Sequence, residues 1–265
     1  MTLRSVTPLL ALLSSLLACG DRASRDAGRI EDSSAGTVSL GLGTRQPYRA
    51  VAVGTPASLA GTVLVRGQLN DSIVGTGVDP RTCGDSATVR EVLARDSSLA
   101  NALVWVDGIT SGKPLPTLRR ATLTFERCRV LPRVLAVTAG TTVNVFANDP
   151  VAHDVRFYRE SRGEPVARVQ TFDAGQVVPS ETIADESGIV EARCTRHPWV
   201  RGYIAVFEHP YFALTDERGA FIIEGLPAGS HTVKVWHEGL EQPLVRQVTI
   251  GAGGSGRLNV TLALR

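Results

Sequence analysis

Short runs of β-branched and aromatic residues, separated by glycine, proline, asparagine and aspartate, dominate the hydrophobic pattern from Ala60 onward. Such runs, bounded by turn-forming residues, predict β-strands. The expected strands cover residues 62–65, 103–106, 142–146, 204–207, 221–223, 233–236 and 258–262. One stretch has helical spacing instead, with Val89, Val92 and Leu93 at i, i+3 and i+4. Many short strands with frequent turns predict an all-β protein built from sandwiches.

The first residues have the pattern of an export signal. Arg4 precedes a nearly unbroken apolar run from Leu9 to Leu17, which is too short to span a bilayer and is typical of a signal peptide. The run ends in Leu-Leu-Ala-Cys, which resembles a bacterial lipobox with Cys19 as the lipidated residue. We therefore expect a lipoprotein signal at residues 1–18 and a lipid-anchored location in the bacterial cell envelope, periplasmic or outer-surface. The alternative is a secretory signal cleaved at a small residue.

Composition sets broad limits on the rest of the chain. Residues 20–57 are rich in glycine, serine, alanine, arginine and aspartate without periodicity, which predicts a flexible tether over residues 19–57. The remaining residues suffice for one large or two small domains. A formal net charge of +2 gives no reason to expect a nucleic-acid partner.

Three cysteines follow Cys19, namely Cys83, Cys128 and Cys194. An exported protein can keep disulfides, but an odd number leaves at least one of the three outside any intramolecular bridge. Spacing alone leaves two kinds of pairing open. Cys83 pairs with Cys128, or one of these two pairs with Cys194.

The C-terminal part has a recognisable rhythm. Thr-Asp-Glu-Arg-Gly-Ala-Phe at residues 215–221 leads into Gly-Leu-Pro-Ala-Gly at residues 225–229 and a strand ending in Trp236. This resembles the carboxypeptidase regulatory-like domain, a small prealbumin-like sandwich. The first strands of that family correspond to residues 61–63 and 102–106, far earlier in this chain.

The resemblance therefore implies one sandwich split in sequence, residues 58–112 plus 209–265, with a second domain, residues 113–208, inserted between its strands. Alternatively, the early strands form an independent pair or extend the sheet of the inserted domain.

Residues with metal-binding chemistry lie within the expected insertion. His153 begins a strand-like segment, and Cys194-Thr-Arg-His197 follows about forty residues later, directly before another strand. Two imidazoles and one thiolate are the donors of a mononuclear blue-copper centre. The same set of donors, carried by a strand end and a short loop, resembles the cupredoxins, and amicyanin most closely. The resemblance implies a Greek-key sandwich and one type-1-like copper ion bound by His153, Cys194 and His197.

Two departures from the family pattern affect the expected site. Val200 occupies the position of the axial methionine, and the chain's single methionine is Met1, so no thioether donor is available after signal cleavage. The copper would be three-coordinate or take a weak contact from the Ala152 carbonyl, which raises its potential. Asp154 replaces an asparagine that bridges the ligand loops in the family. We expect Asn148 and Asp154 around the ligands, with the carboxylate disturbing that outer layer.

The resulting hypothesis is an electron-transfer lipoprotein rather than an enzyme, with an unidentified redox partner. An apolar patch of Pro198, Trp199 and Val200 around His197 is the expected docking surface. If Cys194 binds copper, the favoured disulfide joins Cys83 to Cys128. The alternatives are a copper-binding protein without redox turnover, or a carbohydrate- or protein-binding surface module whose cupredoxin domain is degenerate.

Overall fold

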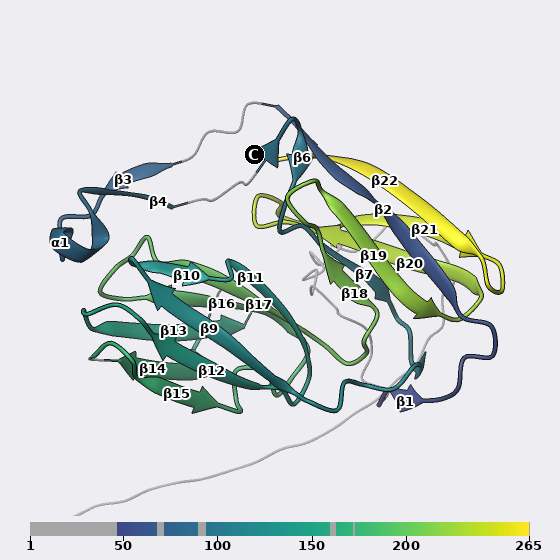
Figure 1. Ribbon diagram of the computed structural model, residues 1–265, viewed down its shortest axis with the longest axis horizontal. Helices are drawn as coiled ribbons and strands as arrows, with labels where there is room; N and C mark the ends of the chain where they lie inside the picture. Colours follow the sequence, from purple (N-terminus) through teal and green to yellow (C-terminus); the bar gives the residue numbers. More distant parts are fainter. Residues whose placement is uncertain (1–46, 68–71, 90–93, 160–162, 172, 265) are drawn as a thin grey trace, which may run out of the picture. The chain divides into compact units, whose positions relative to one another are not determined.

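The computed structural model describes residues 47–67, 72–89, 94–159, 163–171 and 173–264. Within these residues the protein is all-β, as the hydrophobic pattern predicts, apart from the four-residue helix α1 (Pro80–Cys83) (Figure 1). No helix in this part of the chain is long and apolar enough to cross a membrane. The predicted signal peptide and Cys19 lie outside the described residues. So do Val92 and Leu93 of the predicted helix, while Val89 directly follows a strand.

The insertion forms a two-sheet sandwich, which we call the inserted sandwich. One sheet has the order β10-β9-β12-β15 and the other β11-β17-β16-β13-β14. Their bounds are β9 Arg120–Glu126, β10 Arg129–Leu131, β11 Val134–Thr138, β12 Thr142–Ala147, β13 His153–Arg159, β14 Ala167–Thr171, β15 Val177–Ser180, β16 Gly188–Cys194 and β17 Arg201–Phe207. Alternate residues of these strands point inward, as in β12, where Val143, Val145 and Ala147 are buried.

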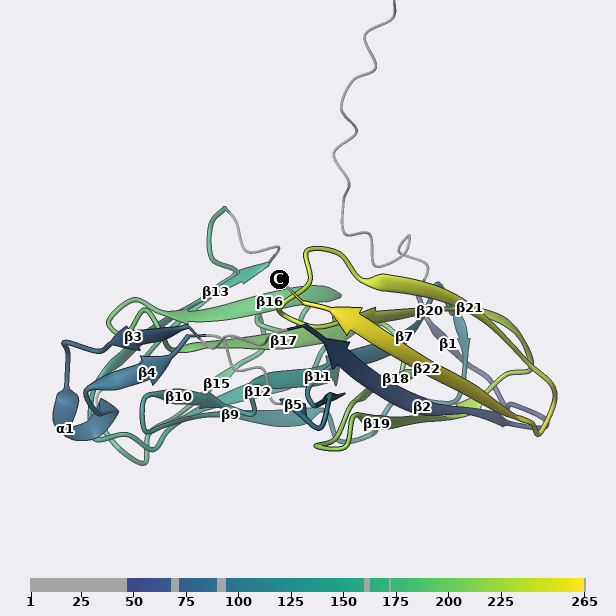
Figure 2. The same cartoon turned by 90° about the horizontal axis from the view of Figure 1, so that it is seen from above.

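The strands before and after the insertion form a second pair of sheets, the outer sandwich. One has the order β18-β7-β20-β21, and the other has β19-β2-β6-β5 with β22 paired to β2. Their bounds are β2 Ala57–Arg66, β5 Ala94–Arg95, β6 Ser98–Leu99, β7 Leu103–Asp107, β18 Phe212–Leu214, β19 Ala220–Leu226, β20 Gly229–Trp236, β21 Leu244–Ile250 and β22 Ser255–Ala263. Figures 1 and 2 both show β22 beside β2, with which it pairs in parallel from Ser58↔Ser255 onward.

Strand β7 explains one continuous apolar run in the sequence. Val104 and Val106 belong to the core of the outer sandwich, while Leu103 and Trp105 belong to a separate cluster that also contains Phe207 of β17. Both faces of the strand are therefore buried, and the run has no polar alternation. The same cluster packs the outer sandwich against the inserted one.

The tether ends earlier than its composition predicts. Strand β1 (Arg49–Ala50) pairs in parallel with β8 (Ser111–Gly112), and the Tyr48 hydroxyl donates a hydrogen bond of 2.6 Å to the Lys113 carbonyl. The predicted boundary at residue 57 is therefore wrong, because a short polar segment can be held by backbone pairing and one aromatic ring without any hydrophobic periodicity.

Residues 72–89 leave the outer sandwich and pack on the inserted one. They contain β3 (Ile73–Gly75), α1 and β4 (Ser86–Thr88), and half-buried Val74, Ala87 and Val89 contact the inserted core. β3 and β4 pair only with each other among the described strands. We call residues 72–89 the cap.

His209 lies in the connection between β17 and β18 and is almost completely buried. Its ring stacks on Phe207 with 5.9 Å between centroids, and its Nδ1 accepts a hydrogen bond from the Tyr211 amide. Burial lowers the pKa of His209 from 6.5 to about 4. Below pH 6.5 His209 binds a proton in the unfolded chain, whereas in the folded protein it stays neutral until about pH 4. The free energy of unfolding therefore falls as the pH drops from 6.5 to about 4.

The variant His209→Asn keeps an acceptor for the Tyr211 amide and removes the titration. Between about pH 7 and pH 4.5, wild-type protein should lose about 2 kcal/mol more of its unfolding free energy than His209→Asn. Urea unfolding at the two pH values measures the difference. Equal losses in the two proteins would show that His209 does not remain neutral.

Candidate metal centre

The structure brings His153, Cys194 and His197 together at one end of the inserted sandwich. His153 is the first residue of β13, Cys194 is the last residue of the neighbouring strand β16, and His197 lies in the loop to β17. Pairing of Val155 with Cys194 sets the register between the two strands. All three side chains are buried, with His197 at 0% exposure.

The three donor atoms converge on one point. Cys194 Sγ lies 3.6 Å from Nδ1 of His153 and 3.6 Å from Nδ1 of His197. The ligand atoms of the group all lie within 4.8 Å of one another. For a metal such as zinc, bonds of about 2.3 Å to sulfur and about 2.0 Å to nitrogen at trigonal to tetrahedral angles imply S···N separations of roughly 3.5–3.7 Å. The spacing fits a first-row metal ion, and the thiolate favours a soft one.

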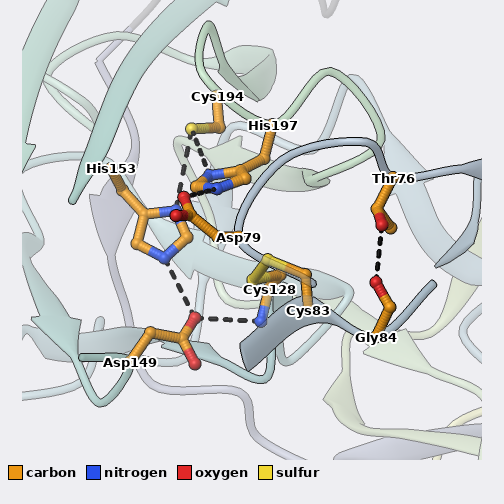
Figure 3. The surroundings of a disulfide bond; sticks show 9 residues. All are labelled: Thr76, Asp79, Cys83, Gly84, Cys128, Asp149, His153, Cys194 and His197. Carbon is orange, nitrogen blue, oxygen red and sulfur yellow. Dashed lines mark hydrogen bonds and ion pairs between the residues drawn. A yellow bond between two sulfur atoms is a disulfide. The ribbon is translucent and has the colours of Figure 1, made fainter. Parts of the chain in front are cut away.

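A carboxylate lies behind each imidazole. Asp149 Oδ2 is 2.9 Å from Nε2 of His153, and Asp79 Oδ2 is 3.0 Å from Nε2 of His197 (Figure 3). A carboxylate only accepts hydrogen bonds at neutral pH, so each Nε2 carries the proton and each Nδ1 is directed at Cys194. Such carboxylate–histidine pairs fix the tautomer and orientation of metal ligands.

The outer layer differs from the one predicted from sequence. Asn148 is exposed, and its backbone amide donates to the Phe125 carbonyl, so the neighbouring buried Asp149 makes the contact with His153. Asn148 was therefore a wrong choice, because the turn between β12 and β13 places residue 149 inside and residue 148 outside.

Asp154 has the bridging role, although it is a carboxylate. It accepts a hydrogen bond of 3.0 Å from the Thr195 hydroxyl, and its own backbone carbonyl accepts one from the Thr195 amide. Arg168 binds both carboxylate oxygens, at 2.8 and 2.9 Å. The hydrogen bond with Arg168 is the largest influence on Asp154 and lowers its pKa, so the charge expected to disturb the site is paired.

The predicted docking patch is absent from the surface. Pro198 is exposed, but Trp199 and Val200 are 6% and 1% exposed, and Trp199 packs edge-on against His197. The cap contributes Asp79 to His197, and cap residues share a cavity wall with Trp199 and Val200. The interpretation of this loop as an exposed apolar surface is wrong, because a segment more than a hundred residues away covers it.

Cys83 of the cap and Cys128 of the inserted sandwich form a disulfide, which leaves Cys194 as the free cysteine among the described residues. The amide of Cys128 donates a hydrogen bond of 2.9 Å to Asp149 Oδ2, the oxygen that also contacts His153. Sequence reasoning did not find Asp79 or Asp149. Asp79 is 118 residues from its partner, and only the pairing of cysteines hinted that its segment lies near the centre.

Burial and hydrogen bonds together set the ionisation of Cys194 and His153. Burial raises the pKa of Cys194, but its hydrogen bonds with His153 and His197 outweigh burial and lower the pKa from 9.0 to about 6. Burial likewise lowers the pKa of His153, and its bonds to Asp149 and Cys194 outweigh that effect and raise it to about 9. Both shifts favour a thiolate at Cys194 beside a protonated His153. A metal bound at this group would displace the His153 proton, so its affinity would rise with pH.

One known domain family matches part of the chain. The family model of the carboxypeptidase regulatory-like domain matches residues 187–263, less than a third of the chain. This match begins before β16, within the inserted sandwich, although the sequence resemblance was confined to the outer one. No curated protein sequence matches the chain.

Solved structures similar to the chain include several copper proteins. A purple cupredoxin from Nitrosopumilus maritimus is 21% identical, with a TM-score of 0.28, over 32% of this chain and 98% of its own. A methionine-to-alanine mutant of amicyanin in its Cu(I) form is 24% identical, with a TM-score of 0.27, over 33% of this chain and 81% of its own. A copper-containing nitrite reductase from Thermus scotoductus is 23% identical, with a TM-score of 0.29, over 39% of this chain and 24% of its own. These likenesses are distant. Metal binding by this chain is therefore inferred only from the positions of His153, Cys194 and His197.

The ionisation of Cys194 is measurable without metal. Thiolate ultraviolet absorbance, taken as the difference from Cys194→Ala protein, should titrate with a midpoint near pH 6. The variant His153→Phe keeps a buried ring but donates no hydrogen bond, so the midpoint should rise by more than about one pH unit. A midpoint near 9.0 in wild-type protein would contradict the arrangement of the two imidazoles around the sulfur.

Proposed function

We propose that the protein is a mononuclear copper protein that transfers electrons in the bacterial cell envelope. The observation that carries this proposal is the convergence of one thiolate and two Nδ1 atoms, each 3.6 Å from the sulfur, in a buried site. Bound at His153, Cys194 and His197, copper would supply one-electron chemistry between its Cu(I) and Cu(II) states.

The residues around the donors suit a site that changes charge without changing shape. Asp149 and Asp79 hold the two rings from behind, and Asp154 ties the first ligand strand to the second ligand loop. Val200 is buried and offers no donor, so no thioether coordinates from this position. Loss of that donor favours Cu(I) and a high potential.

Electron exchange would run through the His197 side of the centre. The ring itself has 0% exposure, but Asp79, which accepts its Nε2 hydrogen, is 32% exposed through its side chain. A single hydrogen bond therefore connects the buried imidazole to the surface of the cap. A partner would dock on the cap rather than on an apolar loop. The lipobox-like residues before Cys19 support a lipid anchor that confines this exchange to the membrane surface.

A copper-binding role without redox turnover is the second candidate, and the cap is the observation that favours it. Complete burial of His197 hinders direct contact between the ligand ring and a partner protein. Cyclic voltammetry distinguishes the two roles, since electron transfer requires a reversible response on the timescale of protein encounters.

Addition of Cu(II) to the metal-free protein should produce an intense visible charge-transfer band between thiolate and copper. Cys194→Ser should abolish the band, because serine keeps the volume but offers no thiolate. His209→Asn is the matched control, since it removes a buried histidine far from the donors and should keep the band. Absence of the band in folded wild-type protein whose Cys194 is reduced would refute the copper centre.

A further inference from the structure

The cap is held over the ligand loop by side-chain contacts rather than by a sheet. β3 and β4 form no ladder with either sandwich in the described part of the chain. The described attachments of the cap to the inserted sandwich include the Cys83–Cys128 disulfide, the bond between Asp79 and His197, a bond from Arg133 to the Val89 carbonyl, and apolar contacts with the inserted core.

The disulfide closes a ring of contacts that contains all three metal donors. Cys194 contacts both imidazoles, His153 contacts Asp149, and Asp149 accepts from the Cys128 amide. Beyond the disulfide, the Cys83 amide donates to the Asp79 carbonyl, and the Asp79 side chain contacts His197. Figure 3 shows the disulfide and the contacts that link Cys194, His153, Asp149 and Cys128, together with the contact between Asp79 and His197. The disulfide therefore helps to hold the part of the cap that contacts His197 through Asp79.

The same disulfide lines a cavity of about 360 Å³. Four of the lining residues are arginines, and among the described residues that line it none is acidic. The lining comprises Cys83, Ser86, Ala87, Thr88, Arg127, Cys128, Arg129, Val130, Arg133, Trp199, Val200 and Arg201.

The arginines that line the cavity favour anionic ligands. Arg127 and Arg129 lie at the exposed rim of the cavity, Arg133 pairs with Glu238 at 2.6 Å, and Arg201 lies 3.7 Å from Glu191. Arginines with low-dielectric walls concentrate anions, and neighbouring cations favour the thiolate form of a cysteine. An anionic thiol in this cavity would meet the disulfide in an environment that stabilises both the attacking and the leaving thiolate.

We propose that the arginine-lined cavity is a binding site for an anionic low-molecular-weight thiol, which reduces the Cys83–Cys128 disulfide and releases the cap from the metal centre. The thiol binds in the cavity and reduces the disulfide. The cap then moves away from His197. The regulatory part rests on the proposed metal function, because the released cap controls access to His197.

The exchange balances with two equivalents of thiol. The thiolate of the first attacks Sγ of half-buried Cys83, forming a mixed disulfide and releasing Cys128 as the thiolate. A second thiolate attacks the external sulfur of the mixed disulfide, releasing Cys83 as a thiolate and the small-molecule disulfide. Two protons from the two thiols end on Cys83 and Cys128. The protein disulfide gains two electrons, and the two thiols lose them.

The first experiment compares three small thiols of different charge on metal-free, disulfide-intact full-length protein: mercaptosuccinate, 2-mercaptoethanol and cysteamine. Each rate of Cys83–Cys128 reduction is divided by the rate of the same thiol on a small neutral disulfide. The normalised rate should be about tenfold higher for the dicarboxylate than for the cation, and salt should reduce the difference. The double variant Arg127→Gln/Arg129→Gln should lose most of this preference.

The matched control is Arg246→Gln/Arg257→Gln, which removes two exposed arginines from the outer sandwich and should keep the preference. Equal normalised rates for the three thiols, or a preference that survives in the Arg127/Arg129 variant, would overturn the anion site.

The second experiment measures cap release through alkylation of Cys194 by iodoacetamide, located by peptide mass mapping. Cys194 is 3% exposed, so reduction of the disulfide should accelerate its alkylation at least tenfold, and reoxidation should restore protection. Cys83→Ser/Cys128→Ser should react as fast without reductant while still unfolding cooperatively. If that variant unfolds, reduced wild-type protein and its reoxidation decide the matter.

Unchanged protection of Cys194 after reduction would overturn cap release. Both experiments use metal-free protein, so their outcome is independent of whether copper binds. A failed copper titration with a positive alkylation result would leave the thiol site standing and refute only the metal function.

Discussion

Carboxylates placed behind two buried imidazoles are the constraint on which the centre depends. A buried imidazole ring can present either nitrogen, and only the Nδ1 atoms of His153 and His197 converge on Cys194. Asp149 and Asp79 occupy the Nε2 atoms and so determine which nitrogen faces the sulfur. Removing the buried Asp149 leaves Nε2 of His153 without its partner, which costs about 1–3 kcal/mol and frees the ring to turn.

The two carboxylates are supplied in different ways, and this difference gives the centre a rigid side and a movable side. Asp149 belongs to the turn before β13 and is tied to the backbone of Cys128 within the inserted sandwich. Asp79 belongs to the cap, which is held by one disulfide and a few side-chain contacts. The half of the site around His153 is thus built into a sheet, whereas the half around His197 depends on a detachable segment.

Local chemistry in the sequence was enough to predict the fold class and to single out His153, Cys194 and His197, which the fold brings together in one buried group. The strand pattern and the Cys-x-x-His loop are local features, and β-sheet register then brings β13 and β16 together. Asp79 was out of reach because no local pattern links it to a residue 118 positions away. Trp199 and Val200 were misjudged for the same reason, since burial by the cap is a tertiary effect that leaves no trace in the loop itself.

Asp154 shows why residue type alone did not predict the surroundings of the centre. A carboxylate near a thiolate is unfavourable in isolation, but Arg168 on the paired strand β14 neutralises it and leaves it free to bridge the ligand segments. Asp154 of β13 pairs with Gln170 of β14, and Arg168 lies two residues from Gln170 on β14. Only the pairing of the two strands makes Arg168 a neighbour of Asp154, so the sequence alone could not predict it.

X-ray absorption at the copper edge of copper-loaded protein tests the central claim most directly, because it counts the donors around the ion. The geometry of Cys194, His153 and His197 predicts one sulfur and two imidazole nitrogens, with no second sulfur. A shell of nitrogen and oxygen donors without sulfur, or a shell with two sulfurs, would contradict this account of the centre.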